Sequence, residues 1–200
     1  MISGIVLAAG GSTRMGRPKQ LLPLAGRPML QHVLDAAEAS PLDEVVVVLG
    51  PGAGEVWAAL RPGPRTRAAV NPQAAEGQST SLRTGLEAVD VEAEAAVVLL
   101  GDQPEIRPDA IGAVIEASRR GGGPVVQAVY GGRPGHPVLF AREAWPDVEA
   151  ATGDEGARRV LAGNPDRVHR VEVGGDPPED MDTEDDYVRI RTRIEEGGSA

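Results

Sequence analysis

Residues 4–30 read GIVLAAGGSTRMGRPKQLLPLAGRPML, and this stretch decides how the chain begins to fold. Its apolar run GIVLAA, residues 4–9, is followed directly by glycines, which is the pattern of a buried β-strand. A polar, glycine-rich loop comes next, and RPMLQHVLDAAEA, residues 27–39, then places apolar side chains at helical spacing. A buried strand, a loop and a helix in succession indicate an α/β unit.

The same alternation continues along the chain. EVVVVLG (44–50) and AAVVLLGD (95–102) predict further buried strands, and RPDAIGAVIEASRR (107–120) predicts one of the amphipathic helices between strands. Strands that are apolar throughout indicate a mainly parallel sheet that is covered on both faces. We therefore expect an α/β fold, with one domain over residues 1–194 and a disordered tail over residues 195–200.

Later segments complete this pattern. PVVQAVY (124–130) and HPVLF (136–140) predict two strands, and GGRPG (131–135) predicts the turn between them. TEDDYVRIRTRIEE (183–196) predicts a closing helix.

Composition limits the classes of function. A net charge of −10 and only five aromatic residues argue against nucleic-acid binding, which needs basic patches or stacking platforms. The absence of cysteine excludes a disulfide framework and a zinc ribbon, and it fits a cytoplasmic protein. The longest apolar runs, Val45–Leu49 and Ala95–Leu100, are too short to cross a bilayer, and we see no signal peptide. We expect a cytoplasmic protein with no membrane partner.

The glycine-rich loop concentrates positive charge. Lys19 is the only lysine, since the other 19 of the 20 basic residues are arginines. Arg14, Arg17 and Lys19 all follow the first predicted strand, where ligands bind in parallel α/β sheets. Three cations in one loop of an acidic protein suit a triphosphate.

The glycines of this loop admit two interpretations. Gly10, Gly11 and Gly16 either form a flexible turn or let backbone N–H groups approach an anion closely. A P-loop would need a lysine and a hydroxyl residue where Arg17 and Pro18 stand, and the dinucleotide fingerprint G-x-G-x-x-G is also missing. The anion interpretation therefore requires a different kind of phosphate loop.

Aspartates at two places are candidate metal ligands. Asp102 ends an apolar run, where a carboxylate costs desolvation free energy unless it is paired or holds a metal. Mg²⁺ takes one or two carboxylates together with substrate phosphates, so Asp102 is either a ligand or a turn residue. Asp182 is the candidate second ligand and Asp180 its competitor, while capping of the last helix by Asp182 or Thr183 is an equally good interpretation.

The chain resembles the MobA-like nucleotidyltransferases. LAAGGSTRMGRPKQLLPLAGRPML (7–30) looks like their signature, roughly L-A-[AG]-G-x-S-x-R-M-G-x-x-K-x-L. The resemblance continues in EGQSTSLRTGL (76–86), GDQP (101–104), GHPVLF (135–140), GDEGARRVL (153–161) and DMDTEDDY (180–187), and so covers nearly the whole chain. Their order and spacing are most similar to the molybdenum cofactor cytidylyltransferase branch. This implies a Rossmann-like, three-layer α/β/α fold of the nucleotide-diphospho-sugar-transferase type.

The resemblance also implies roles for individual residues. Arg14 would bind the β- and γ-phosphates, Lys19 would reach the α-phosphate, and Asp102 with Asp182 would hold Mg²⁺. The nucleotide would contact Leu7, Ala8, Ala9, Gly10, Gly11, Ser12, Arg14, Lys19, Gln78, Ser79 and Ser81, and the acceptor would contact His136, Asp154 and Arg158. Simpler interpretations stay open, since Ser79 and Ser81 suit helix capping and Asp154 with Arg158 suits an ion pair on a helix surface.

The expected reaction is the transfer of CMP from CTP to the terminal phosphate of molybdopterin-type molybdenum cofactor, with release of pyrophosphate. The guanylyl-transferring branch resembles LAGG at the start of the loop, so Ala9 favours a pyrimidine. The alternatives are guanylyl transfer to the same cofactor, cytidylyl or uridylyl transfer to a sugar or polyol phosphate, a non-catalytic nucleotide sensor or chaperone, and a Rossmann oxidoreductase. A molybdoenzyme or its chaperone is the expected recipient of the product.

Overall fold

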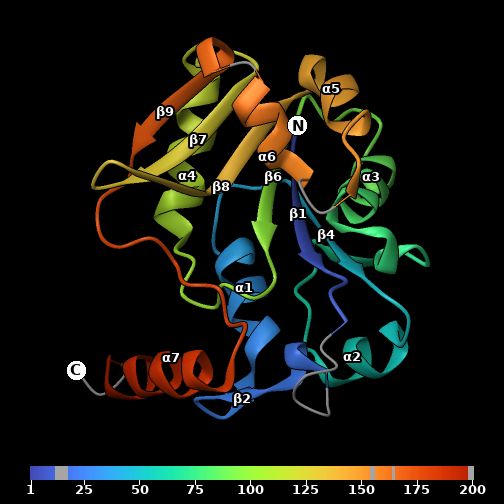
Figure 1. The fold of residues 1–200 in the computed structure, drawn as a ribbon, viewed down its shortest axis with the longest axis vertical. Helices are drawn as coiled ribbons and strands as arrows, with labels where there is room; N and C mark the ends of the chain where they lie inside the picture. Colours follow the sequence, from blue (N-terminus) through green and yellow to red (C-terminus); the bar gives the residue numbers. More distant parts are fainter. Residues whose placement is uncertain (12–17, 154–155, 164, 198–200) are drawn as a thin grey trace.

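The centre of the molecule is a mixed β-sheet (Figure 1). The computed structural model describes residues 1–11, 18–153, 156–163 and 165–197, and within them seven strands pair in the order β5-β4-β1-β6-β8-β7-β9. The strands are β1 (Ile2–Ala8), β4 (Glu44–Leu49), β5 (Thr66–Val70), β6 (Ala95–Leu100), β7 (Val125–Tyr130), β8 (Arg133–Ala141) and β9 (Val168–Glu172). The predicted runs at residues 4–9, 44–50 and 95–102 thus form three neighbouring strands.

Most neighbouring strands run parallel, as predicted. β1 pairs in parallel with β4 and β6, and β4 pairs in parallel with β5. β8 alone is antiparallel to both of its neighbours, β6 and β7, while β9 is parallel to β7. Ala8 lies opposite Leu49, and Leu7 lies opposite Leu100, so β1, β4 and β6 end at the same edge of the sheet.

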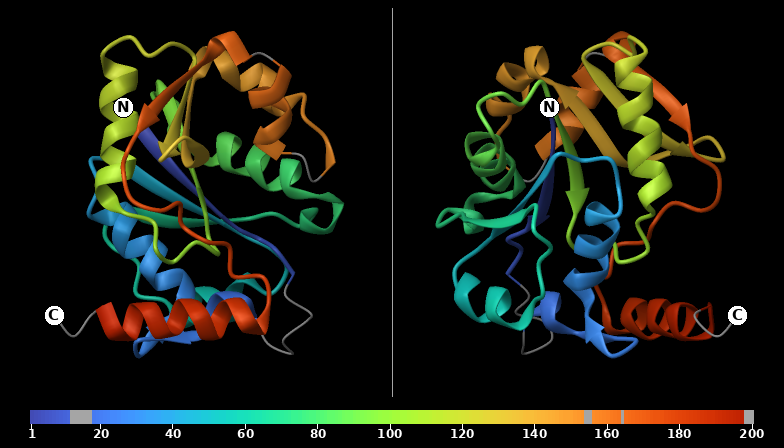
Figure 2. Two further views of the ribbon diagram at one scale, coloured as in Figure 1. Left: turned by 60° about the vertical axis from the view of Figure 1, so that its left-hand side comes forward. Right: turned by 180° about the vertical axis from the view of Figure 1, so that it is seen from behind.

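Helices cover both faces of this sheet and make the predicted three layers (Figure 2). α1 (Met29–Glu38), α2 (Ala53–Ala59) and α4 (Pro108–Arg119) pack on one face through a core that includes Val6, Val47 and Leu99. α3 (Gln78–Ala88), α5 (Trp145–Glu149) and α6 (Gly156–Gly163) pack on the other face, over Ile5, Val48 and Val98. Because successive strand residues point to opposite faces, an all-apolar strand fills both cores.

The turn between β7 and β8 is shorter than the predicted segment 131–135. Gly131 and Gly132 both have positive φ angles, 56° and 82°, which suit a two-residue hairpin turn. Arg133 then already pairs with Tyr130, so β8 begins three residues earlier than the sequence pattern predicts.

A separate layer lies below the sheet edge where β1 and β6 end (Figure 1). It consists of α7 (Glu184–Gly197) and the small hairpin of β2 (Pro23–Leu24) with β3 (Arg27–Pro28). A buried cluster joins the two through Leu22, Leu24, Met29, Met181, Tyr187 and Ile190. The short 3-10 segments are Lys19–Leu21, Ala74–Glu76, Arg142–Ala144 and Pro165–Arg167.

The end of α7 corrects the expected tail. Residues 195–197 were expected to be disordered, but they complete the last turn of α7. Ile194 packs against the cluster under this helix, and Glu195 pairs with Arg191 one turn earlier. Both contacts stabilise the last turn of the helix. Within the described part of the chain, the helices are all too short or too polar to cross a membrane.

Candidate active site

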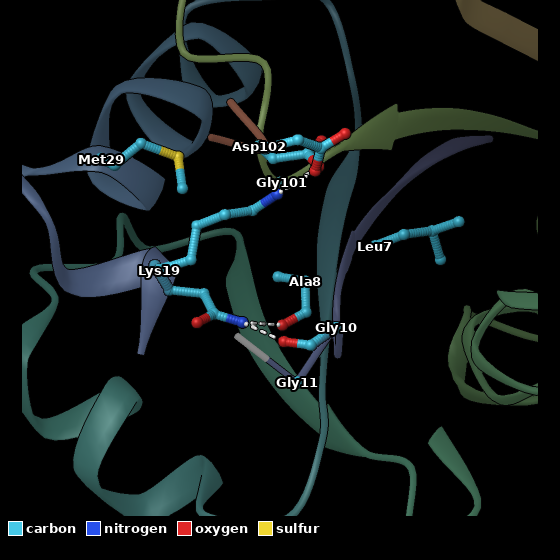
Figure 3. A pocket seen from close by; sticks show the side chains of 10 residues that line it. Leu7, Ala8, Gly10, Gly11, Lys19, Met29, Gly101 and Asp102 are labelled. Atoms are coloured by element: carbon cyan, nitrogen blue, oxygen red, sulfur yellow. Dashed lines mark hydrogen bonds and ion pairs between the residues drawn. The ribbon is translucent and has the colours of Figure 1, made fainter. Parts of the chain in front are cut away.

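A cavity of about 370 Å³ opens where β1 and β6 end, and we call it the charged cavity (Figure 3). Its lining brings together residues far apart in the sequence: Leu7, Ala8, Gly10, Gly11, Lys19, Gln20, Met29, Gly101, Asp102 and Asp182. Seven of these ten are among the predicted site residues. The charged cavity thus lies beyond the carboxyl ends of parallel strands, where a ligand site was expected.

Gly101 lets the end of β6 lie directly against β1. Its N–H donates to the carbonyl of Leu7 at 2.9 Å, and a Cβ atom at this position would lie only 2.7 Å from the Cβ of Ala8. A larger residue would push the two strand ends apart. The glycine therefore holds Asp102, the next residue, at the floor of the charged cavity.

Lys19 joins two carboxylates across this cavity. Its Nζ lies 2.8 Å from Asp102 Oδ2 and 2.9 Å from Asp182 Oδ1, and the side chain reaches toward Asp102 in Figure 3. Burial opposes the charge of Lys19, but the attraction of Asp102 and Asp182 outweighs it, so the pKa of Lys19 is raised. The ammonium therefore stays charged at neutral pH.

A buried methionine brings Asp182 to this position. Met181 is fully buried in the cluster under α7, and its N–H donates to the carbonyl of Asp102 at 3.0 Å. The segment that leads into α7 is thereby fixed beside the end of β6. Asp182, the next residue, is then free to turn toward Lys19.

The alternatives for the late aspartates separate in the structure. Thr183 caps α7, since its Oγ1 accepts from the N–H of Asp186 at 3.1 Å and its own N–H donates to the Asp186 carboxylate at 2.9 Å. Asp180 accepts a hydrogen bond from Gln103 Nε2 at 2.8 Å. Asp182 is thus the late aspartate that shares Lys19 with Asp102.

The donor set suits a metal ion that also binds substrate phosphates. Asp102 and Asp182 both face the point that the Lys19 ammonium takes, so an ion there would meet one oxygen from each. Among the residues that the structure describes, no group of three or more acidic, histidine or cysteine side chains is placed to hold a metal. Two carboxylates with phosphate oxygens completing the shell match Mg²⁺, whereas an all-protein cage would need more ligands.

A second, larger cavity lies on the other side of the loop that follows β1. It measures about 660 Å³, and we call it the apolar cavity because aliphatic side chains and glycines dominate its lining. Leu49, Gly50 and Ala53 contribute from the end of β4 and the start of α2, and Ala74 contributes from the segment before α3. Ala8, Gly10, Gly11 and Gln20 line both cavities.

The predicted nucleotide contacts divide into three groups. Leu7, Ala8, Gly10, Gly11 and Lys19 line the charged cavity, and Ala9 lines the apolar cavity. Ser12 and Arg14 lie outside the described residues.

The contacts predicted on α3 lie elsewhere. Ser79 and Ser81 are buried in the first turn of the helix, and Ser81 Oγ accepts a hydrogen bond from Asn71 Nδ2 at 3.0 Å. Gln78 is exposed at the start of the same helix. Neither serine caps the helix, because residue 77 takes the N-cap position. None of the three is among the residues lining either cavity.

The predicted acceptor residues lie toward β8 and α6. His136 continues the β8 strand past the pair formed by Val98 and Val138, which puts it opposite the end of β6. Burial, and secondarily the charge of Arg158, lowers the pKa of His136 to about 4, so this histidine is neutral at pH 7. Arg158 is exposed on α6, and Asp154 lies outside the described residues.

Sequence reasoning missed several lining residues. Gln20 is buried directly behind Lys19, and its amide holds the start of the glycine-rich loop. Met29 and Gly101 complete the charged cavity. The position of Gln20 in the quoted motif was visible, but nothing in the sequence indicated that its side chain would turn inward.

Comparison with protein families gives one broad match. The family model described as the MobA-like NTP transferase domain matches residues 4–171.

Curated relatives match over different lengths. "Nicotine blue oxidoreductase" from Paenarthrobacter nicotinovorans is 31% identical over 199 residues, which covers 94% of this chain and 96% of that protein. "Bifunctional protein GlmU" from Sorangium cellulosum is 43% identical over 115 residues, 54% of this chain. That match spans only 24% of the GlmU protein, so the likeness concerns one part of it.

Solved structures are similar over nearly the whole chain. The homologue of Mycobacterium tuberculosis Rv0371c from Mycobacterium sp. strain JC1 is 35% identical with a TM-score of 0.88, covering 98% of this chain and 97% of that one. Rv0371c of M. tuberculosis H37Rv in complex with manganese is 32% identical with a TM-score of 0.81, covering 96% and 98%. A 4-diphosphocytidyl-2C-methyl-D-erythritol synthase from Anaerococcus prevotii, at 17% identity, a TM-score of 0.73 and 97% and 96% coverage, shares the fold. The predicted nucleotide-diphospho-sugar-transferase-type fold is thereby confirmed.

Proposed function

Because the chain belongs to the MobA-like NTP transferase family, we propose that it transfers CMP from CTP to the terminal phosphate of a molybdopterin-type molybdenum cofactor. The observation that carries this proposal is the ammonium of Lys19 between Asp102 and Asp182, beside a glycine-rich loop. A cation and two carboxylates at the end of a parallel sheet are what a metal-bound triphosphate needs.

In this reaction an oxygen of the acceptor's terminal phosphate forms a bond to the α-phosphorus of CTP. The bond from that phosphorus to the bridging oxygen breaks, and pyrophosphate leaves with the electron pair. Such chemistry depends mainly on positioning and on neutralising charge. No side-chain nucleophile is required, because the acceptor supplies the attacking oxygen.

Lys19 and the two carboxylates would have different roles in this reaction. Lys19 would turn from Asp102 and Asp182 to the α-phosphate, where negative charge grows in the transition state. Arg14, in the segment the structure does not describe, would hold the leaving pyrophosphate. Asp102 and Asp182 would hold Mg²⁺, which supplies Lewis-acid neutralisation of the phosphate oxygens when bound. The manganese complex of Rv0371c supports a divalent ion in this family.

The two cavities support a nucleotide that straddles the loop after β1. The charged cavity suits the phosphates, and the apolar cavity suits the base and ribose. Ala9 lines the apolar cavity, where its methyl group favours a pyrimidine over a purine. His136 and Arg158 would meet the acceptor.

A panel assay tests this proposal. Purified protein is incubated with Mg²⁺, each of the four NTPs and either loaded molybdopterin-type cofactor or a sugar phosphate, and pyrophosphate release is measured. We expect release only with CTP and the cofactor, and far slower release from Asp102→Asn. Release with GTP and not CTP would show that GTP is the nucleotide donor. Release with a sugar phosphate would show that the acceptor is not the molybdopterin-type cofactor.

A second candidate comes from the name of one relative. Nicotine blue oxidoreductase is similar over nearly its whole length, which favours a redox activity. The loop after β1 lacks G-x-G-x-x-G, so a dinucleotide would have to bind in another way. The same protein should therefore be assayed for oxidation of NADH and NADPH with a quinone-type dye. Turnover there without pyrophosphate release in the panel would favour this candidate.

A further inference from the structure

Gln20 ties two backbone carbonyl groups together beneath the glycine-rich loop. Its Nε2 donates to the carbonyl of Ala8 at 2.7 Å and to the carbonyl of Gly10 at 3.1 Å. Dashed lines in Figure 3 mark these two bonds at the labelled Ala8 and Gly10. An amide nitrogen carries two hydrogens, so a single glutamine can satisfy both carbonyls. Gln20 is only 8% exposed and follows Lys19 in the same short 3-10 segment.

These two bonds fix the direction of two N–H groups. In a trans peptide the C=O and N–H point in opposite directions. With the carbonyls of Ala8 and Gly10 held toward Gln20, the N–H groups of Ala9 and Gly11 point away from it. Both N–H groups belong to residues that border the cavities, since Gly11 is exposed and lines both, and Ala9 is buried and lines the apolar cavity.

The cavity side of this backbone has room for a ligand as far as the described residues go, because a Cβ atom on Gly10 or Gly11 would meet no described atom within 4 Å. Both residues line the charged cavity and the apolar cavity. Two N–H groups at these cavities, beside the ammonium of Lys19, suit the oxygen acceptors of a nucleotide.

We infer that Gln20 is a positioning residue for the nucleotide, acting through the N–H groups of Ala9 and Gly11. This inference rests on the proposed function in one respect, that the ligand is an NTP. Without the glutamine amide, the two carbonyls could turn outward and present oxygen atoms to an anionic ligand. The loop would then repel the anionic nucleotide.

The chain offers a matched control in Gln31, on α1. Gln31 is 6% exposed, and its Nε2 donates to Asp35 Oδ1 at 2.7 Å and to the carbonyl of Arg61 at 3.1 Å. It is a glutamine of similar burial whose amide nitrogen makes two comparable bonds and whose Oε1 also accepts from the N–H of Arg61 at 2.8 Å, but it lines neither cavity. Loss of Gln31 should reduce stability in the same way and leave the ligand site intact.

The test compares Gln20→Met, Gln20→Glu and Gln31→Met with wild type. The dissociation constant of Mg·CTP is measured by calorimetry without acceptor, and the unfolding midpoint is measured in parallel. We expect Gln20→Met to raise this constant about tenfold or more, since two hydrogen bonds that orient the loop are lost. Gln20→Glu should raise it further, because an ionised carboxylate accepts only and repels both carbonyls. Gln31→Met should stay within about twofold.

The outcomes separate this inference from the proposed function. The role of Gln20 would be overturned if both Gln20 variants bound CTP as tightly as wild type. It would also be overturned if their CTP affinity fell no more than that of Gln31→Met. If Gln20→Met does not fold, the volume-matched Gln20→Glu decides. Weakened CTP binding in the Gln20 variants, with no pyrophosphate release from wild type and any acceptor, would support Gln20 and overturn the transferase proposal. Wild type that binds no NTP would overturn both.

Discussion

The charged cavity and the apolar cavity share the loop after β1 but differ in almost everything else. The charged cavity has Asp102 and Asp182, each within ion-pair distance of Lys19. The apolar cavity has Leu49, Val56 and several glycines and alanines instead. One short loop thus separates a cavity with charged side chains from a larger cavity with a mainly aliphatic and glycine lining.

This division follows from what each part of the sheet edge carries. A glycine and an aspartate directly follow β6, and the segment before α7 adds a second aspartate. β4 ends in Leu49 and is followed by Gly50, and α2 begins with small residues. A ligand that is anionic at one end and planar at the other satisfies both sides, and mutations should separate the two contributions.

The largest expected effect falls on the charged cavity. Asp102→Asn removes one of the two carboxylates that face the Lys19 ammonium, and we expect pyrophosphate release to fall about a thousandfold. Initial rates with saturating CTP measure this. Asp109→Asn is the control, since Asp109 is an exposed partner of Arg107 at the start of α4. A loss of less than tenfold in Asp102→Asn would contradict the assignment.

Lys19→Arg should have the next largest effect, on turnover and not on binding. Arginine keeps the positive charge, but its planar guanidinium is bulkier than a compact ammonium and crowds the line of attack. We expect kcat to fall about a hundredfold, while the dissociation constant of CTP changes less than about threefold. Single-turnover rates and calorimetry measure the two quantities. Near-normal turnover would show that a point charge is not needed here.

A smaller effect should come from filling the apolar cavity. Ala53 lies in its wall at the start of α2, so Ala53→Leu should obstruct a nucleobase and weaken CTP binding about tenfold. Affinity for inorganic pyrophosphate should not change, because the charged cavity is untouched. Ala59→Leu, at the exposed end of the same helix, serves as the control. Equal losses for CTP and pyrophosphate would show that the cavities do not act separately.

The smallest effect concerns His136, which lies outside both cavities. Its pKa is about 4 in the folded chain, below the ordinary 6.5, so the unfolded chain binds more protons between these values. Stability is therefore full above pH 6.5 and falls as the pH drops toward 4. From pH 7 to pH 5.5 we expect a loss of about 1 kcal/mol, which His136→Gln should lack. Denaturant unfolding of both proteins at the two pH values measures it, and parallel pH dependence would refute it.

The sequence was sufficient for the parts that rest on local pattern. The apolar runs at β1, β4 and β6 predicted buried parallel strands, and parallel strands end at one edge, so Asp102 was expected near the glycine-rich loop. The pairing of Lys19 with Asp102 realises that expectation across 83 residues. These predictions succeed because successive side chains of a strand point to opposite faces of the sheet, and because parallel strands end at the same edge.

What could not be predicted depends on contacts between distant segments. Asp182 reaches the site only because Met181 is buried between α7 and the hairpin of β2 and β3, and no local pattern specifies that packing. Ser79 and Ser81 suited helix capping or nucleotide contact, yet tertiary packing buries both, residue 77 takes the N-cap position, and Asn71 donates to Ser81. The inward orientation of the Gln20 side chain also depends on tertiary packing. From its sequence pattern alone, a polar residue at the end of a loop is expected to face solvent.

The bridge formed by Lys19 means that the protein carries a counterion of its own. Two facing carboxylates would repel each other in a cleft that held no cation, and the tethered ammonium of Lys19 offsets that repulsion while it lies between them. Dialysis and chelators cannot take away a cation that is part of the chain, so folding does not wait for a metal. Under the proposed function, loading the cleft with Mg²⁺ would exchange one cation for another, and the displaced ammonium would become available to the arriving phosphates.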